Sequence, residues 1–268
     1  IHTFTGLVWP TATGMKRKLL MMTDWLTCAC ATHVIPEGQG VLNDLKNDGI
    51  TKKPMKVLGY GNVKGVDMER FSPARFVVTK NPDVFTFVFV GRIVSDKGIN
   101  ELVEAFVKLH DKHKNTRLVL VGNYEHNLDP VSDKTRQLIE TNDGIEACGA
   151  KYGDDLLQMY VDADCFVMPS YREGFPNTVL EAGAMGLPSI VTDINGSREI
   201  IENEKNGLIV PSKNADALYN AMLRMLTDDV ARERMMGNAR PMIASRFERG
   251  FVQSCQIEFY ERVLNFEF

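Results

Sequence analysis

The chain has 268 residues, of which 44% are hydrophobic and 25% charged, and its formal net charge at pH 7 is −4. This composition is typical of a globular protein and excludes a disordered or fibrous one. The length allows one large α/β domain with a fragment, or two small domains. The acidic balance excludes nucleic acid as the main partner, because binding a phosphate backbone needs a basic excess.

Cysteine usage and hydropathy bear on the cellular compartment. The five cysteines are odd in number and lack the paired spacing of a zinc site or a disulfide framework. They predict reduced core thiols and a cytoplasmic protein. No apolar run approaches the ~20 residues of a membrane span. The basic run at 16–18 is compatible with a solvated helix face and with peripheral contact at the cytoplasmic face of the inner membrane.

The first 60 residues are typical of the end of an α/β domain. We predict strands at 1–6, 32–35 and 56–59, and helices at 15–31 and 41–47. The chain opens at Ile1, inside an apolar run and without methionine, so we expect the earlier part of this domain to be missing. The glycine-rich stretch 59–67 predicts a linker.

A second series of elements follows the linker. We predict strands at 85–90, 117–121, 145–148, 165–168, 189–192 and 207–210. Helices are predicted at 99–113, 131–140, 154–161, 178–185, 197–202, 215–226, 230–245 and 251–266. Short apolar strands that alternate with longer amphipathic helices indicate an α/β fold with a Rossmann-like, doubly wound parallel sheet. Ligands of such sheets bind beyond the carboxyl ends of the strands.

The loop after the first of these strands runs from Gly91 to Gly98 and leads into a helix. Glycine lets the backbone approach a ligand, and Arg92 and Lys97 can converge on one anion near the helix start. The loop therefore suits a diphosphate, although a solvated basic turn explains it equally well.

The loop after strand 165–168 carries two carboxylates. Glu173 lies in the loop, and Glu181 lies about one turn into the following helix, so the two can face one ligand from different sides. Pro176 precedes the helix start, where Asn177 or Thr178 can cap the helix or offer backbone N–H groups to a phosphate. The ordinary alternative is that Glu173 interacts with the helix dipole and that Glu181 is a surface residue.

The run from Glu173 to Glu181 resembles the E-x7-E signature of retaining GT-B glycosyltransferases of family 4. Together with the G-R-x-x-x-x-K-G loop it extends this resemblance over residues 54–266. The opening His2 to Gly6 and Trp9 resemble the acceptor domain of bacterial capsule and O-antigen members. The resemblance implies a remnant of the N-terminal acceptor domain with the linker at 1–75, a donor-binding domain at 76–248 and a crossover helix at 249–268.

The resemblance also implies roles for individual residues. Arg92 and Lys97 would neutralise the donor diphosphate as the glycosidic bond breaks, Glu173 would contact the donor sugar, and Glu181 would accept hydrogen bonds from the ribose. The remaining donor contacts would come from Gly91 and from Gly174, Phe175, Asn177 and Thr178, with the loop at 148–151, including Ala150 and Lys151, lining a base that we expect to be uracil.

The implied reaction is transfer of a sugar, with retention, from a UDP-sugar to a saccharide or undecaprenyl-linked acceptor in surface polysaccharide synthesis. No cofactor and no metal is expected, because Arg92 and Lys97 supply the positive charge. Many relatives have a histidine where this chain has Thr5, and we give His2 no catalytic role. The alternatives are a catalytically silent nucleotide-sugar-binding module or partner subunit, and a nucleotide-sugar epimerase, which the E-G-F-P-N-T run fits poorly.

Overall fold

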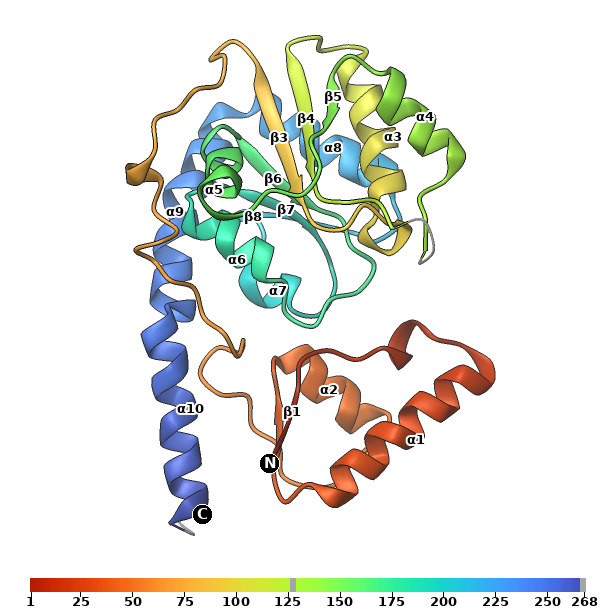
Figure 1. The fold of residues 1–268 in the computed structure, drawn as a ribbon, viewed down its shortest axis with the longest axis vertical. Coiled ribbons are helices and arrows are strands. Elements are labelled where there is room, and N and C mark those ends of the chain that lie inside the picture. The colour runs from red at the N-terminus through yellow and green to blue at the C-terminus, as the bar shows by residue number, and fades with distance from the viewer. Residues whose placement is uncertain (126–128, 266–268) are drawn as a thin grey trace.

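The structure, a computed structural model, describes residues 1–125 and 129–265. Most of the chain after residue 84 forms an α/β domain around one parallel sheet of six strands in the order β5-β4-β3-β6-β7-β8 (Figure 1). The strands are β3 (Phe85–Val90), β4 (Thr116–Val121), β5 (Ile145–Ala147), β6 (Cys165–Met168), β7 (Ser189–Thr192) and β8 (Gly207–Val210). The predicted doubly wound sheet is thus confirmed, and its strand order reverses between β3 and β6.

Helices cover both faces of this sheet (Figure 1). Helices α3 (Ile99–His110) and α8 (Ala215–Thr227) supply the apolar core on one face, with α4 (Asp133–Thr141) beside them. The other face carries α5 (Gly153–Val161), α6 (Asn177–Ala184) and α7 (Ser197–Ile200). In α3 the buried residues Leu102, Phe106 and Leu109 recur at helical spacing, which explains why this segment buries one side.

The N-terminal part is a smaller α/β unit. Its strands β1 (His2–Phe4) and β2 (Val34–Pro36) pair in parallel, and its helices are α1 (Gly14–Cys30) and α2 (Gln39–Asn47). A short 3₁₀ turn, η1 (Trp9–Thr11), buries Trp9, whose indole N–H donates to the Asp24 carboxylate at 2.8 Å. This unit has its own apolar core around Phe4, Trp9 and Leu45.

One predicted strand is wrong. Residues 56–59 form no strand, and the pairing there is a single bridge between Val34 and Met55. Only two apolar residues follow Lys56 before Gly59, whose φ of 57° lies in the left-handed region and ends any extended run. The segment belongs to the connection between the two units.

Two segments cross between the units. The connection from residue 48 to residue 84 contains one 3₁₀ turn, η2 (Pro73–Arg75). At the far end of the chain, α9 (Asp229–Phe247) packs on the domain that contains the six-stranded sheet. Helix α10 (Arg249–Leu264) then runs down beside the N-terminal unit (Figure 1). The predicted end of this helix, residue 266, lies outside the described residues. No helix in residues 1–125 and 129–265 is long and apolar enough to cross a membrane.

A buried carboxylate at the end of β2 gives the fold a pH-dependent stability. Glu37 is 5% exposed, and burial together with nearby Glu199 raises its pKa from 4.5 to about 7, although the Val63 backbone N–H opposes the shift. The folded state therefore binds more protons than the unfolded state between these two values. The free energy of unfolding should fall as the pH rises from about 4.5 to about 7, by up to about 3 kcal/mol.

Glu37→Gln should remove this dependence, because glutamine resembles the protonated carboxyl group. We expect the variant to gain stability relative to the parent chain as the pH rises, with the difference levelling off above the folded pKa. Thermal unfolding of both chains across this pH range measures it. A constant difference between the two chains would contradict the assigned shift.

Candidate functional site

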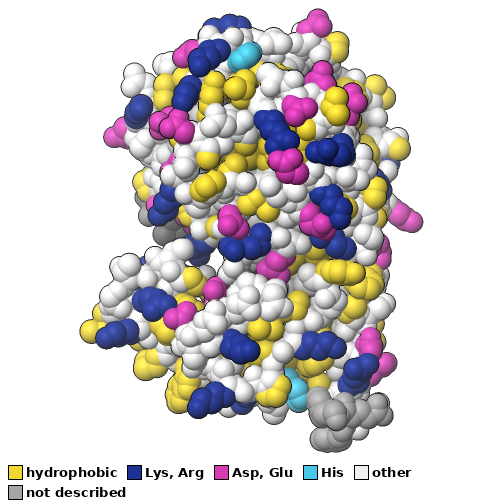
Figure 2. Space-filling model, turned by 180° about the vertical axis from the view of Figure 1, so that it is seen from behind, with side chains coloured by type: hydrophobic (Ala, Val, Ile, Leu, Met, Phe, Trp, Pro, Cys, Tyr) yellow, Lys and Arg dark blue, Asp and Glu magenta, His cyan; other side chains and the backbone are white. Residues whose placement is uncertain are grey.

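The loops after β3 and β6 meet where the strand order reverses, as expected for the ligand site of such a sheet. They form one wall of a cleft whose other wall is the loop after β1, residues 5–8. The space-filling view shows an indentation between the two units (Figure 2). Gly98, with φ at 71°, allows this meeting, because a Cβ atom there would lie 2.1 Å from the Pro169 carbonyl oxygen.

The cleft brings together the predicted Lys97 and Glu173. Lys97 lies at the end of the 3₁₀ turn η3 (Ser95–Lys97), and its Nζ lies 2.5 Å from Glu173 Oε1. The two side chains are only 15% and 13% exposed. The second predicted cation, Arg92, lines the same cleft, is half-exposed and pairs with Glu125 at 2.9 Å. The cleft thus carries positive charge that neighbouring carboxylates neutralise, and an anionic ligand would have to compete with these carboxylates.

Several cleft residues escaped the sequence analysis. Arg172 adds a third cation and pairs with Asp96 at 3.2 Å, while the other oxygen of Asp96 is buried and unpartnered among the described residues. The adjacent Tyr171 donates to both oxygens of Glu101 at 2.7 Å, which fixes the loop from behind. The signal for Arg172 was its position next to Glu173 in a loop already predicted to bind ligand.

Helix α6 begins directly after Pro176, as predicted, but of the two roles predicted for Asn177 or Thr178 the structure does not show side-chain capping. The N-cap residue is Pro176, without a side-chain cap. The Asn177 amide oxygen instead accepts from Asn62 Nδ2 of the connection at 3.2 Å, and the Thr178 hydroxyl lies 3.7 Å from the Met168 sulfur. Neither side chain satisfies the N–H groups of the first turn of α6. Phe175 is buried against Phe247 of α9.

Glu181 faces a second cavity, on the other side of the E-x7-E run. Asn177 also lines it, together with Lys64 and Arg70 of the connection. Burial raises the pKa of Glu181, while Lys64, the Tyr160 hydroxyl and Arg70 counteract the rise. Lys64 lies within the predicted linker at 59–67, and Arg70 lies just after it. Their position shows that the connection supplies positive charge around this carboxylate.

The predicted base-binding loop lies beside the loop after β3, which is predicted to bind the diphosphate. The Gly122 N–H donates to the Gly149 carbonyl oxygen at 2.9 Å, and the Ala150 N–H donates to Asn123 Oδ1 at 3.2 Å. Lys151 follows directly and is partly exposed. A Cβ atom at Gly122 would lie 1.8 Å from the Gly91 carbonyl oxygen, so the loops after β3, β4 and β5 are in direct contact at the carboxyl edge.

Polar contacts join the N-terminal unit to the domain that contains the six-stranded sheet. Glu199 of α7 accepts the N–H groups of Gln39 and Gly40 at 2.5 and 3.0 Å, at the positive start of α2. Asn195 Nδ2 donates to Asp44 of the same helix at 2.6 Å. A carboxylate of one unit thus caps a helix of the other and joins the two units.

Two units that enclose a cleft, with cations and carboxylates at the carboxyl edge of a Rossmann-like sheet, define the GT-B class of fold. Sucrose-phosphate synthase from Thermosynechococcus elongatus superposes with a TM-score of 0.82 at 23% identity, covering 98% of this chain and 67% of that one. HepE from Anabaena, solved in complex with UDP and glucose, gives 0.79 at 18% identity over 98% of this chain and 70% of HepE.

The family model "Glycosyl transferases group 1" matches residues 71–242, and the chain belongs to this family. The capsular polysaccharide biosynthesis glycosyltransferase CapM of Staphylococcus aureus is 27% identical over 92% of this chain and 66% of its own length. A Campylobacter jejuni enzyme, N,N'-diacetylbacillosaminyl-diphospho-undecaprenol alpha-1,3-N-acetylgalactosaminyltransferase, is 29% identical over 75% of this chain and 53% of its own length. The chain thus spans no more than about two thirds of these relatives.

Proposed function

We propose that the chain is the donor-binding part of a retaining glycosyltransferase that takes a sugar from a UDP-sugar in bacterial surface polysaccharide synthesis. The observation that carries the proposal is the Lys97–Glu173 pair beside Arg92 and Arg172 in the cleft. A diphosphate leaving group gathers negative charge as the bond to the sugar breaks, and fixed cations stabilise that charge. In this assignment Glu173 is released from Lys97 to contact the sugar.

The division of the chain follows from this assignment. Residues 76–248 bind the donor through Gly91, Arg92 and Lys97 and through the E-x7-E run, with Ala150 and Lys151 near the base. Residues 1–75 carry part of the acceptor side, and 249–268 form the crossover helix. Relatives named for undecaprenyl-linked acceptors support a saccharide or lipid-linked acceptor at the cytoplasmic face of the inner membrane.

The cations of the cleft make a metal unnecessary in this assignment, since they supply the positive charge that would neutralise the diphosphate. UDP titrations with and without a chelator should therefore give the same affinity. A loss of binding on chelation, restored by a divalent cation, would contradict metal-independent donor binding.

Calorimetric titration with UDP tests the donor site. Glu181→Ala should weaken UDP binding about tenfold to a hundredfold, because a charged acceptor contributes roughly 1.5–3 kcal/mol per hydrogen bond. Glu233→Ala, at an exposed position of α9, is the matched control and should bind as the parent chain does. Equal affinities for UDP in all three chains would remove Glu181 from the site, and UDP binding no tighter than ADP or GDP would contradict uracil recognition.

A further inference from the structure

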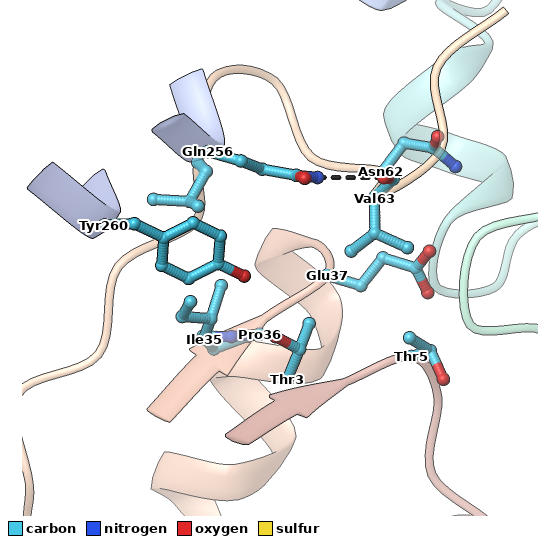
Figure 3. Close-up of a pocket in the computed structure, with 10 residues that line it drawn as sticks. Thr3, Thr5, Ile35, Pro36, Glu37, Asn62, Val63, Gln256 and Tyr260 are labelled. Carbon is cyan, nitrogen blue, oxygen red and sulfur yellow. Dashed lines mark hydrogen bonds between the residues drawn. The ribbon is translucent and has the colours of Figure 1, made fainter. Parts of the chain in front are cut away.

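A separate cavity lies next to the cleft, between the carboxyl ends of β1 and β2, the connection and α10. We call it the Glu37 pocket, after the buried carboxylate in its wall (Figure 3). None of the predicted donor-site residues lines it. Thr5 lines both this pocket and the cleft, so the two spaces meet at the loop after β1.

The walls of the Glu37 pocket combine an aromatic ring, aliphatic groups and hydrogen-bonding groups. Figure 3 shows the Tyr260 ring of α10 across the cavity from Glu37, with Ile35 beside the ring and Val63 beside Glu37, whose carboxylate lies at the end farther from Tyr260. The hydroxyl of Thr3 adds a donor and acceptor from β1. Among the described residues, no lysine, arginine or histidine lines the pocket, so its walls are unsuited to a phosphate or diphosphate group.

The pocket is held in shape from several sides. Gln256 Nε2 of α10 donates to the Val63 carbonyl oxygen at 2.8 Å, which joins the helix to the connection. The Glu37 carbonyl oxygen accepts from the Asn62 N–H at 2.8 Å, and the Glu37 N–H donates to Phe4 at 2.9 Å. The backbone of Glu37 is thus fixed on both sides. The residue is 5% exposed, and it is not among the residues assigned to the donor.

The free space of the pocket is about 130 Å³. A protein cavity of about 150 Å³ admits benzene, so the pocket takes part of a larger six-membered sugar ring, whose remaining groups would extend toward the cleft at Thr5. Binding such a ring requires a ligand with one face for the Tyr260 ring and with hydroxyl groups for Glu37 and Thr3. Carbohydrate rings have both features, because their C–H groups gather on one face and their hydroxyl groups lie around the edge.

We propose that the Glu37 pocket binds one pyranose ring of the acceptor saccharide, stacked on Tyr260 and hydrogen-bonded to Glu37. The proposal rests on the proposed function and deepens it, since it assigns the acceptor a place that the donor residues do not touch. Thr5 lies between this ring and the cleft, where the adjoining sugar unit meets the donor. The pocket therefore selects neutral sugar units at some distance from the reacting hydroxyl.

Saturation-transfer NMR on the 268-residue chain tests the proposal. The probes are the methyl glycosides of glucose, galactose and N-acetylglucosamine, with benzylamine as a cationic ring of similar size. We expect at least one glycoside to bind with its ring protons close to Tyr260. Measured at about pH 8, where the Glu37 carboxyl group is mostly ionised, Glu37→Gln should weaken glycoside binding about tenfold, because it removes the charged acceptor and keeps the size of the side chain. Tyr260→Ala should weaken it at least as much, and Tyr260→Phe, which keeps the ring, should bind within about twofold of the parent chain.

Two controls separate this proposal from the donor assignment. Arg92→Ala should weaken UDP binding and leave glycoside binding unchanged, while Glu37→Gln should do the reverse. Glycoside binding that ignores both Glu37→Gln and Tyr260→Ala, or tighter binding of benzylamine than of every glycoside, would overturn the proposal even with UDP bound normally. If the chain bound a glycoside through Glu37 and failed to bind UDP, the donor assignment would fall and the saccharide site would stand.

Discussion

Lys97→Ala is expected to weaken UDP binding about 100-fold, equivalent to about 3 kcal/mol. The variant removes a cation from the diphosphate and also leaves the Glu173 carboxylate, 13% exposed, without the partner that now lies 2.5 Å away. Removing one member of a nearly buried pair costs more than the pair itself contributes, because the remaining charge stays desolvated. In the cleft this charge would also repel the diphosphate.

A second substitution separates the two contributions. Lys97→Ala combined with Glu173→Gln should recover about tenfold in UDP affinity relative to Lys97→Ala alone, because the repelling carboxylate is gone. Lys134→Ala, at an exposed position of α4, should leave the affinity unchanged. Calorimetric titration of the parent chain, the single variants Lys97→Ala and Glu173→Gln, and the double variant gives the coupling energy directly. Strict additivity of the two cleft substitutions would mean that Lys97 and Glu173 act on the ligand independently.

The strands of the large sheet could be predicted closely from the sequence. Those at 85–90, 165–168, 189–192 and 207–210 end where predicted, because each is a largely buried and largely apolar run followed by a glycine, proline or polar residue. The failed strand at 56–59 shows the limit of this rule. Met55 bridges to β2 directly before it, but its two apolar residues do not continue the pairing, and only tertiary structure decides that.

The loops of the candidate site could be predicted from the sequence, but the contacts between their side chains could not. The rule that ligands bind at the carboxyl edge located both loops, and the switch between β3 and β6 brings Lys97 and Glu173 together although 76 positions separate them in sequence. The partners that come from the connection and the N-terminal unit, such as Lys64 beside Glu181, carry no local pattern. Glu37 is likewise an unremarkable glutamate in sequence and becomes distinctive only through burial.

Gly174→Ala is expected to lower the free energy of unfolding by about 1–3 kcal/mol and to weaken UDP binding. Gly174 is not among the residues of positive φ, so alanine strains no backbone dihedral there. Its Cβ atom would instead lie 2.1 Å from the Thr5 carbonyl oxygen and 2.8 Å from the Gly6 Cα. Both are backbone atoms that cannot rotate away, so the loop after β1 must move off the donor-side loop.

Gly237→Ala provides the matched control for this substitution. Gly237 lies in α9 with no atom near its Cβ position, and alanine there should raise stability by up to about 1 kcal/mol. Thermal unfolding and amide hydrogen exchange of Thr5 and Gly6 measure the difference, and we expect faster exchange only in Gly174→Ala. If exchange at these amides stayed as slow as in the parent chain, the closed contact between the two units would not depend on Gly174. Faster exchange together with weaker UDP binding would show that the loop after β1 and the proposed donor site are coupled through the backbone contact between Gly174 and residues 5–6.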